Sequence, residues 1–225
     1  MYSRVGRLHG VQSEPTAVYQ NFKKGWCLMN QEHPNYGLKT GITWTEWWRK
    51  LVKKSLGDHP GSLKAADELI KIFGTAEGWR PIDGALPLLD ELKGSNIDLG
   101  IISNFDPRLQ PILISLGMDG YFTFVTTSYD AGVLKPDPAI FKYSENLYKK
   151  LTGKDLDGRN ALHIGDSYEL DYSSALSVGW NAALVNSSGL VTQNTDCGQV
   201  FRDLYELRTY FKNVLKTTQL SNLKE

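Results

Sequence analysis

The sequence is poor in cysteine: Cys27 and Cys197 are the only two, and they form neither a metal-binding pair nor a disulfide framework. It also lacks a charge excess, because 25 lysines and arginines balance 25 aspartates and glutamates. No basic run is long enough to bind nucleic acid or an anionic membrane surface, and no apolar run is long enough for a secretory signal or a membrane span. These absences exclude nucleic acid and membranes as partners. They predict a soluble intracellular protein, cytoplasmic with the nucleus as the alternative location.

The first third of the chain has helical periodicity. A helix is expected over 16–30, a second over 43–56 with Thr43 as its cap, and a third beginning at Ser62. In the first of these, the apolar residues at helical spacing are Ala17, Val18, Phe22, Trp26 and Met29. On the same face Cys27 is expected in the core. We therefore predict a helical domain over residues 1–78.

The remainder, 79–225, alternates short apolar runs with amphipathic segments. Strands are expected over 98–103, 122–127, 160–165 and 181–186, and helices over 85–93, 107–116, 138–151, 170–178 and 203–216. This alternation predicts an α/β domain with a doubly wound parallel sheet, whose ligands bind at the carboxyl ends of the strands.

Chemically useful side chains follow three of the predicted strands. Ser103 and Asn104 end the first, Lys135 lies in the loop after the second, and Asp166 and Asp171 follow the third. A hydroxyl, a lysine and a carboxylate pair suit a phosphoryl group with Mg²⁺: Ser103 and nearby amides would bind phosphate oxygens, Lys135 would offset their charge, and the carboxylates would hold the metal. Taken singly, each residue also fits a helix cap or a solvated loop.

The order of these residues separates the two interpretations. Lys135 lies 32 residues after Ser103, and Asp166 lies 31 residues after Lys135, so each interval is about one strand–helix unit. The segments ISNFD, KPDP and GDSYELD resemble the second, third and fourth motifs of the haloacid dehalogenase superfamily of phosphohydrolases. HPNYG, the WW pair and SNFDPRL narrow the resemblance to one branch of that family. By the same resemblance, the helical first third corresponds to the family's cap domain.

The resemblance also implies a part that is not in the sequence. Members of the family begin with a strand ending in Asp-x-Asp-x-Thr, whose first aspartate attacks phosphorus and helps the residue matching Asp166 to hold the metal. Here the chain opens at MYSRVGRL, which matches the helix leading into the cap. The first, central strand, between 98–103 and 160–165, is therefore expected to be missing. Asp106 and the pair Asp155 and Asp157 are poor replacements for the nucleophile by position.

Three hypotheses follow. The first is a phosphatase-type hydrolase homologue for a small phosphorylated molecule, inactive as this chain because the nucleophile is absent. The second is a non-catalytic scaffold that binds a phosphorylated ligand or a protein partner. The third is an N-terminally truncated product of a gene encoding an active Mg²⁺-dependent phosphatase. The sequence identifies neither the substrate, nor a protein partner, nor the oligomeric state.

Two further positions have competing interpretations. Asn35 and Tyr36, in the HPNYG loop, either face the substrate or form an ordinary surface turn. His163 lies inside a predicted strand, and we expect a buried packing residue there rather than a ligand.

Overall fold

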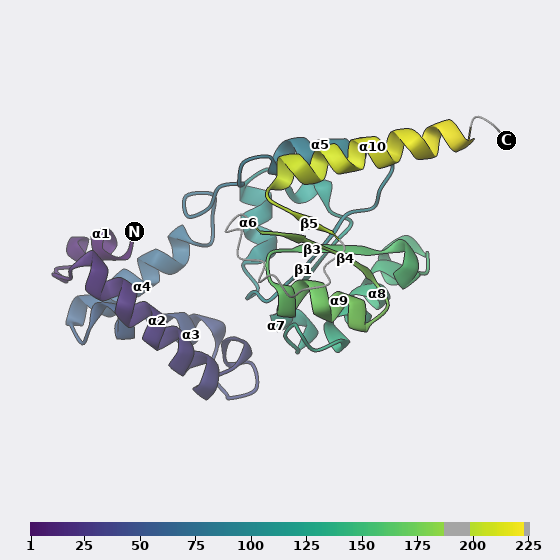
Figure 1. Cartoon of the computed structure of the whole chain (residues 1–225). Helices are drawn as coiled ribbons and strands as arrows, with labels where there is room; N and C mark the ends of the chain where they lie inside the picture. The colour runs from purple at the N-terminus through teal and green to yellow at the C-terminus, as the bar shows by residue number, and fades with distance from the viewer. Residues whose placement is uncertain (187–198, 223–225) are drawn as a thin grey trace. The chain divides into compact units, whose positions relative to one another are not determined.

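The computed structural model describes residues 1–186 and 199–222, so Cys197 lies outside the described residues (Figure 1). The chain forms two compact units. Unit 1 contains Met1–Arg80, Asn104–Asp119 and Thr127–Val133, and unit 2 contains Pro81–Ser103, Gly120–Thr126 and the described part of the chain from Leu134 onward. None of the described helices is long and apolar enough to cross a membrane.

Unit 1 is helical. Its elements are α1 (Tyr2–Leu8), α2 (Pro15–Glu32), a 3-10 turn at Asn35–Gly37, α3 (Trp44–Leu56), α4 (Pro60–Ile72), α6 (Leu109–Ser115) and α7 (Ser128–Ala131). Thr43 caps α3 as predicted: its hydroxyl accepts from the Glu46 amide, and the Glu46 carboxylate accepts from the Thr43 amide. The cap of α4 differs from the prediction, because His59 accepts from the Gly61 amide and Pro60 begins the helix. Ser62 is instead buried in the first turn.

The buried face of α2 is also displaced from the predicted one. Val18 and Met29 are buried as expected, but Ala17 and Cys27 are exposed and Trp26 is 36% exposed. The reason is the approach of α3 at Gly25, where an added β-carbon would stand 3.0 Å from the Leu51 side chain. Because glycine lets the two helices approach closely, the contact centres on Gly25 and turns Trp26 towards solvent.

Unit 2 is an α/β unit. Its elements are α5 (Ala85–Gly94), β1 (Gly100–Ser103), β2 (Phe124–Thr127), α8 (Ala139–Thr152), β3 (Leu162–Gly165), a π-helical turn (Tyr168–Ser173), α9 (Ser174–Ser177), β4 (Asn181–Val185), β5 (Val200–Phe201) and α10 (Leu204–Asn222). The four predicted strands are confirmed with trimmed ends, and the sequence did not predict β5. The helix expected over 170–178 is instead the π-helical turn followed by α9.

The strands form two separate hydrogen-bonded ladders, β1–β2 and β3–β4–β5. In the larger ladder β4 runs parallel to both of its neighbours, with Ile164 opposite Ala183. Helices α5 and α10 lie side by side over the strands (Figure 1), and their apolar residues share a buried cluster with Ala183 and Phe201. Among the described residues, no strand pairs with both β1 and β3, so each of these two strands has one edge without a ladder.

These two edges predict the behaviour of the 225-residue chain in solution. Strand edges without partners leave backbone donors and acceptors open and favour intermolecular pairing. We expect the chain to be largely insoluble when expressed alone, or to populate a loosely packed state that binds the dye ANS and has a weak near-ultraviolet circular dichroism signal. A soluble monomer with one sharp melting transition above about 50 °C would contradict this expectation.

Candidate functional site

The predicted site residues of unit 2 lie at the ends of its strands. Ser103 is the last residue of β1, Asp166 follows β3 directly, and Asp171 lies in the π-helical turn. Lys135 comes from the loop between α7 and α8. A β-carbon added at Gly165 would overlap the Asp171 carboxyl group, so glycine at the end of β3 is what allows Asp171 to fold back against the strand.

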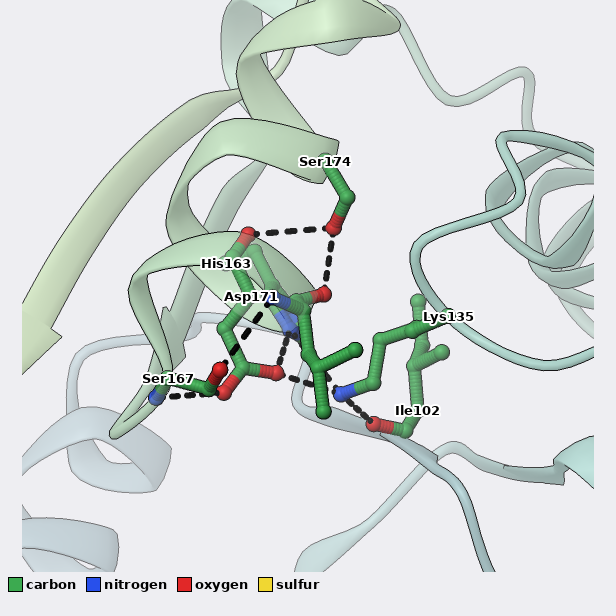
Figure 2. Close-up of polar contacts among 7 residues, drawn as sticks. Ile102, Lys135, His163, Ser167, Asp171 and Ser174 are labelled. Atoms are coloured by element: carbon green, nitrogen blue, oxygen red, sulfur yellow. Dashed lines mark hydrogen bonds and ion pairs between the residues drawn. The ribbon is translucent and has the colours of Figure 1, made fainter. Parts of the chain in front are cut away.

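Lys135 is the centre of a buried polar network, which Figure 2 shows. Its ammonium group lies 2.6 Å from Asp171 Oδ1 and donates over 2.7 Å to the backbone carbonyl of Ile102 in β1. His163 Nε2, on β3, lies 3.4 Å from the same ammonium and 3.2 Å from Asp171 Oδ1. Lys135 exposes only 8% of its surface. The network therefore joins β1 to β3, two strands that share no ladder.

Asp171 is held as a carboxylate by its neighbours. Burial by itself raises the pKa of Asp171, but hydrogen bonds from His163 and Lys135, the Lys135 charge and the Ser167 amide outweigh burial and hold that pKa well below its usual range. The Ser167 amide donates to Oδ2 over 3.0 Å. The π-helical turn is fixed at its start by the Ser167 hydroxyl, which accepts from the Leu170 amide, and at its end by the Ser174 hydroxyl, which donates to the Leu170 carbonyl (Figure 2).

His163 is a buried residue, as predicted, but it also belongs to the polar network. Its ring packs edge-on against Phe141 at a centroid distance of 5.3 Å. Burial lowers the pKa of His163, the Lys135 charge lowers it further, and the Asp171 carboxylate only partly opposes them. The imidazole is therefore neutral near pH 7, and Lys135 and Asp171 form an ion pair whose charges cancel.

The two residues predicted to hold a metal have different surroundings. Asp166 is exposed, whereas both carboxylate oxygens of Asp171 already accept hydrogen bonds from the protein. Within the described residues no group of three or more His, Cys, Asp or Glu side chains could hold a metal ion. The donor set thus fits Mg²⁺ only in part, with Asp166 as the available carboxylate, and joint coordination by Asp166 and Asp171 stays a prediction.

The two remaining predicted residues, Ser103 and Asn104, belong to different units. Ser103 is half-buried and directly follows Ile102, whose carbonyl binds Lys135, and a shared role for the Ser103 hydroxyl and the Lys135 ammonium stays a prediction. Asn104 is the next residue along the chain but belongs to unit 1, where its backbone carbonyl accepts a 3.0 Å hydrogen bond from the Tyr36 hydroxyl.

The HPNYG loop is not an ordinary surface turn, and whether Asn35 and Tyr36 face a substrate stays a prediction. Asn35 and Tyr36 are both buried and both have positive φ, 50° and 56°. The Asn35 amide donates to the Ser128 carbonyl over 2.7 Å, and the Ser128 hydroxyl donates back to the Asn35 side-chain oxygen over 2.9 Å. Residue 37 must be glycine, because its φ is 84° and an added β-carbon would meet Ile42 at 2.3 Å. These hydrogen bonds connect the loop to α7 within unit 1.

A second buried ion pair, in unit 1, was missed by the sequence analysis. Asp106 is fully buried and takes two hydrogen bonds from the Arg108 guanidinium, at 2.6 and 2.9 Å, and a third from Trp48 Nε1 at 2.8 Å. In the sequence, the Asp-Pro-Arg run at the second motif was the only feature that could have indicated this ion pair. Since both carboxylate oxygens are occupied, the structure agrees with the low expectation for Asp106 as a replacement nucleophile.

Comparison with known protein sequences identifies the family. Residues 11–179 match the family of haloacid dehalogenase-like hydrolases. The chain is 33% identical to the Rhythmically expressed gene 2 protein of Drosophila melanogaster over 223 residues, covering 91% of this chain and 85% of that protein. It is 36% identical to haloacid dehalogenase-like hydrolase domain-containing protein 3 of Bos taurus over 189 residues, covering 82% and 73%. These relatives confirm the resemblance carried by the three motifs.

Comparison with solved structures supports the fold. The putative HAD-hydrolase YfnB from Bacillus subtilis, whose structure is bound to magnesium, has a TM-score of 0.68 at 20% identity and covers 94% of this chain and 91% of its own. A HAD phosphatase from Thermococcus onnurineus has a TM-score of 0.61 at 23% identity and covers 93% and 86%. The α/β fold with a helical cap is therefore confirmed.

Removing the charge of Lys135 should destabilise unit 2. Lys135→Met leaves the buried Asp171 carboxylate without its cation and the Ile102 carbonyl without its donor, and breaking a buried pair in this way costs about 3–5 kcal/mol. Urea denaturation should show the loss. Lys149→Met is the matched control: its partner Asp155 lies 2.7 Å away, but both side chains are exposed, so little change is expected. Equal effects of the two variants would contradict the assignment.

The pH dependence of stability should report on His163. A histidine whose pKa is lower in the folded than in the unfolded state contributes stability above its unfolded value of 6.5 and loses it as the pH falls through the folded value. The free energy of unfolding should therefore decrease between about pH 7 and pH 5. We expect His163→Gln to lose less stability over this interval. Parallel curves for the variant and the parent would show that His163 does not titrate as described.

Proposed function

Because the chain belongs to the haloacid dehalogenase-like hydrolases, we propose that unit 2 carries the phosphate-binding part of a phosphatase-type site for a small phosphorylated molecule in the cytoplasm. The observation that carries this proposal is the placement of Lys135. A buried ammonium at the end of β1, fixed by a carboxylate and a backbone carbonyl, is a preorganised charge for an anion that arrives at the strand ends.

The roles divide among the residues at this edge. Lys135 offsets phosphate charge, and the Ser103 hydroxyl offers a hydrogen bond to a phosphate oxygen. Asp171 is the positioning residue, because it holds Lys135 in place through the 2.6 Å contact. Since Asp171 also cancels the charge of Lys135, tight binding of a phosphate dianion calls for a second cation.

Mg²⁺ is the cation that the family relationship supports, and Asp166 is the residue that would hold it. When bound, the ion would supply the positive charge that the Lys135–Asp171 pair cancels. One exposed carboxylate is a poor Mg²⁺ site, since this ion demands octahedral oxygen geometry and gives up its waters reluctantly. We therefore expect no Mg²⁺ binding below millimolar concentrations in calorimetry.

In the part of the chain that the structure describes, the aspartates considered as replacement nucleophiles are poorly placed to attack phosphorus. The 225 residues include no Asp-x-Asp-x-Thr sequence. Asp106 is occupied by Arg108 and Trp48, and Asp157 pairs with Arg159 ahead of β3. We propose that these residues bind a phosphorylated ligand without cleaving it. The scaffold hypothesis and the phosphatase hypothesis thus share one site and differ in whether a nucleophile reaches it.

Activity measurements should separate the two. The 225-residue chain in Mg²⁺ should hydrolyse a generic phosphomonoester negligibly, because loss of the nucleophile lowers turnover on the order of 10⁶-fold in well-studied hydrolases. Contaminant-free protein that turns over at about 1 s⁻¹ or faster would contradict this.

The matched positive experiment adds a strand bearing Asp-x-Asp-x-Thr ahead of Met1. We expect this extended form to hydrolyse the ester, and Lys135→Ala or Asp166→Asn to abolish the activity. Lys149→Ala, at an exposed ion pair, is the control that should leave it unchanged. An extended form that stays fully active with both site changes would show that the site is assigned wrongly.

A further inference from the structure

The charge of this protein is distributed unevenly along the chain. Residues 15–56, from the start of α2 to the end of α3, contain only two acidic residues, Glu32 and Glu46. The same stretch contains seven basic residues, all of them exposed: Lys23, Lys24, Lys39, Arg49, Lys50, Lys53 and Lys54. Because the 225 residues together have no net charge, the rest of the chain has an acidic excess of the same size. The two helices therefore form a basic surface on a neutral protein.

Three of these lysines line a hollow of about 500 Å³ in unit 1. The residues that line it are Glu32 at the end of α2, Lys50, Lys53 and Lys54 on α3, and Gly57 and Asp58 just after α3. Lys50 and Lys54 are four residues apart, so they lie on the same face of α3, one turn from each other. We call this hollow the lysine groove.

A fourth lysine, on α2, approaches the groove from the neighbouring helix. Helices α2 and α3 lie side by side (Figure 1) and meet at Gly25, where an added β-carbon would stand 3.4 Å from the Lys54 β-carbon. Lys24 directly precedes Gly25 and is exposed. The close approach that glycine permits thus brings cations of two helices near each other.

Most of the charge at the groove is not cancelled by the protein itself. Lys53 pairs with Asp58 at 2.8 Å. Within residues 1–186 and 199–222, no carboxylate forms an ion pair with Lys24, Lys50 or Lys54. Like charges held close together repel one another, and an anionic partner bound between them removes that repulsion.

The two carboxylates of the groove favour a peptide over other polyanions. A nucleic-acid backbone presents phosphate oxygens, which Glu32 and Asp58 would repel. An acidic peptide presents carboxylates to the lysines and also backbone N–H groups, which can donate to the oxygens of Glu32 and Asp58. The groove therefore has complementary groups for both parts of an acidic peptide.

The spacing of the lysines fits an extended chain. Lys50 and Lys54 are separated by a rise of about 6 Å along the helix axis. Alternate residues of an extended strand are about 6.5 Å apart and point to the same side. We propose that the lysine groove binds an extended acidic segment of a partner protein, with aspartate or glutamate at alternate positions. This interaction does not depend on phosphate binding or on hydrolysis.

Fluorescence anisotropy on the full chain tests the proposal, with a labelled peptide of about ten residues that alternates glutamate and glycine. At about 50 mM salt we expect saturable binding with a Kd on the order of 100 µM, because exposed ion pairs are individually weak. Raising the salt to about 500 mM should weaken binding at least tenfold, since salt screens exposed charges. The same peptide with glutamine in place of glutamate should not bind. Absence of saturation, or equal binding of the glutamine peptide, would overturn the proposal.

Two double variants with the same loss of charge provide the matched pair. Lys50→Gln with Lys54→Gln removes two cations of the groove and should weaken binding of the acidic peptide at least tenfold. Lys149→Gln with Lys150→Gln removes two exposed cations of α8 and should leave the affinity unchanged within about twofold. Equal losses in the two variants would show that the peptide senses only the net charge, which would overturn the groove as the site.

Two further measurements test the identity of the occupant. Single-stranded DNA with as many charges as the peptide, and vesicles of phosphatidylserine and phosphatidylcholine, should both bind more weakly than the peptide. Tighter binding of either would replace the protein partner by nucleic acid or by a membrane. Sedimentation without peptide should show no self-association that Lys50→Gln with Lys54→Gln abolishes. Such self-association would identify a second copy of this chain as the occupant and overturn the proposal.

The test does not depend on the solubility of the 225-residue chain. The extended form with a strand bearing Asp-x-Asp-x-Thr ahead of Met1 carries the same α2 and α3. It should bind the acidic peptide with the affinity expected for the shorter chain, whether or not it hydrolyses a phosphomonoester. An extended form that is an active phosphatase but does not bind the peptide would overturn this proposal and leave the proposed function intact.

Discussion

The arrangement of unit 2 depends on the buried contact between Lys135 and Asp171. The strands fall into two ladders, and the Lys135 ammonium spans them by binding Ile102 of β1 and the carboxylate that folds back against β3. A buried ion pair offsets the cost of removing its charges from water only when its remaining hydrogen bonds are satisfied. Here the Ser167 amide and the His163 ring supply the remaining hydrogen bonds to the Asp171 carboxylate. The contact that connects β1 with β3 is therefore also the contact that holds the Lys135 ammonium in place at the candidate site.

Much of this architecture could be predicted from the sequence, because local patterns carry it. The apolar runs predicted four strands, and Thr43 predicted the start of α3. The partner of Asp171 could not be predicted in the same way. Whether this carboxylate faces a metal or a lysine depends on the π-helical turn, and no pattern of apolar residues distinguishes such a turn from an ordinary helix start. The exposure of Trp26 depends on Gly25 meeting α3, which is a packing detail.

Which segments of the chain make up unit 1 could not be predicted either, because that depends on contacts between residues far apart in the sequence. Its two later segments join the cap helices through side-chain contacts across long sequence separations, of which Asn35 with Ser128 and Trp48 with Asp106 are the polar examples. Sequence reasoning assigned HPNYG to a surface turn or to the substrate because the loop has turn-forming residues. In the structure its positive φ angles direct two buried side chains to distant backbone carbonyls.

The interleaving of the two units constrains how this protein can be altered or dissected. The chain passes from one unit to the other after residues 80, 103, 119, 126 and 133. A single protease cut or a single splice junction therefore cannot release either unit as an intact piece, as it could where one linker joins two consecutive domains. A recombination event that exchanged residues 1–80 for those of a relative would leave the segments 104–119 and 127–133 behind.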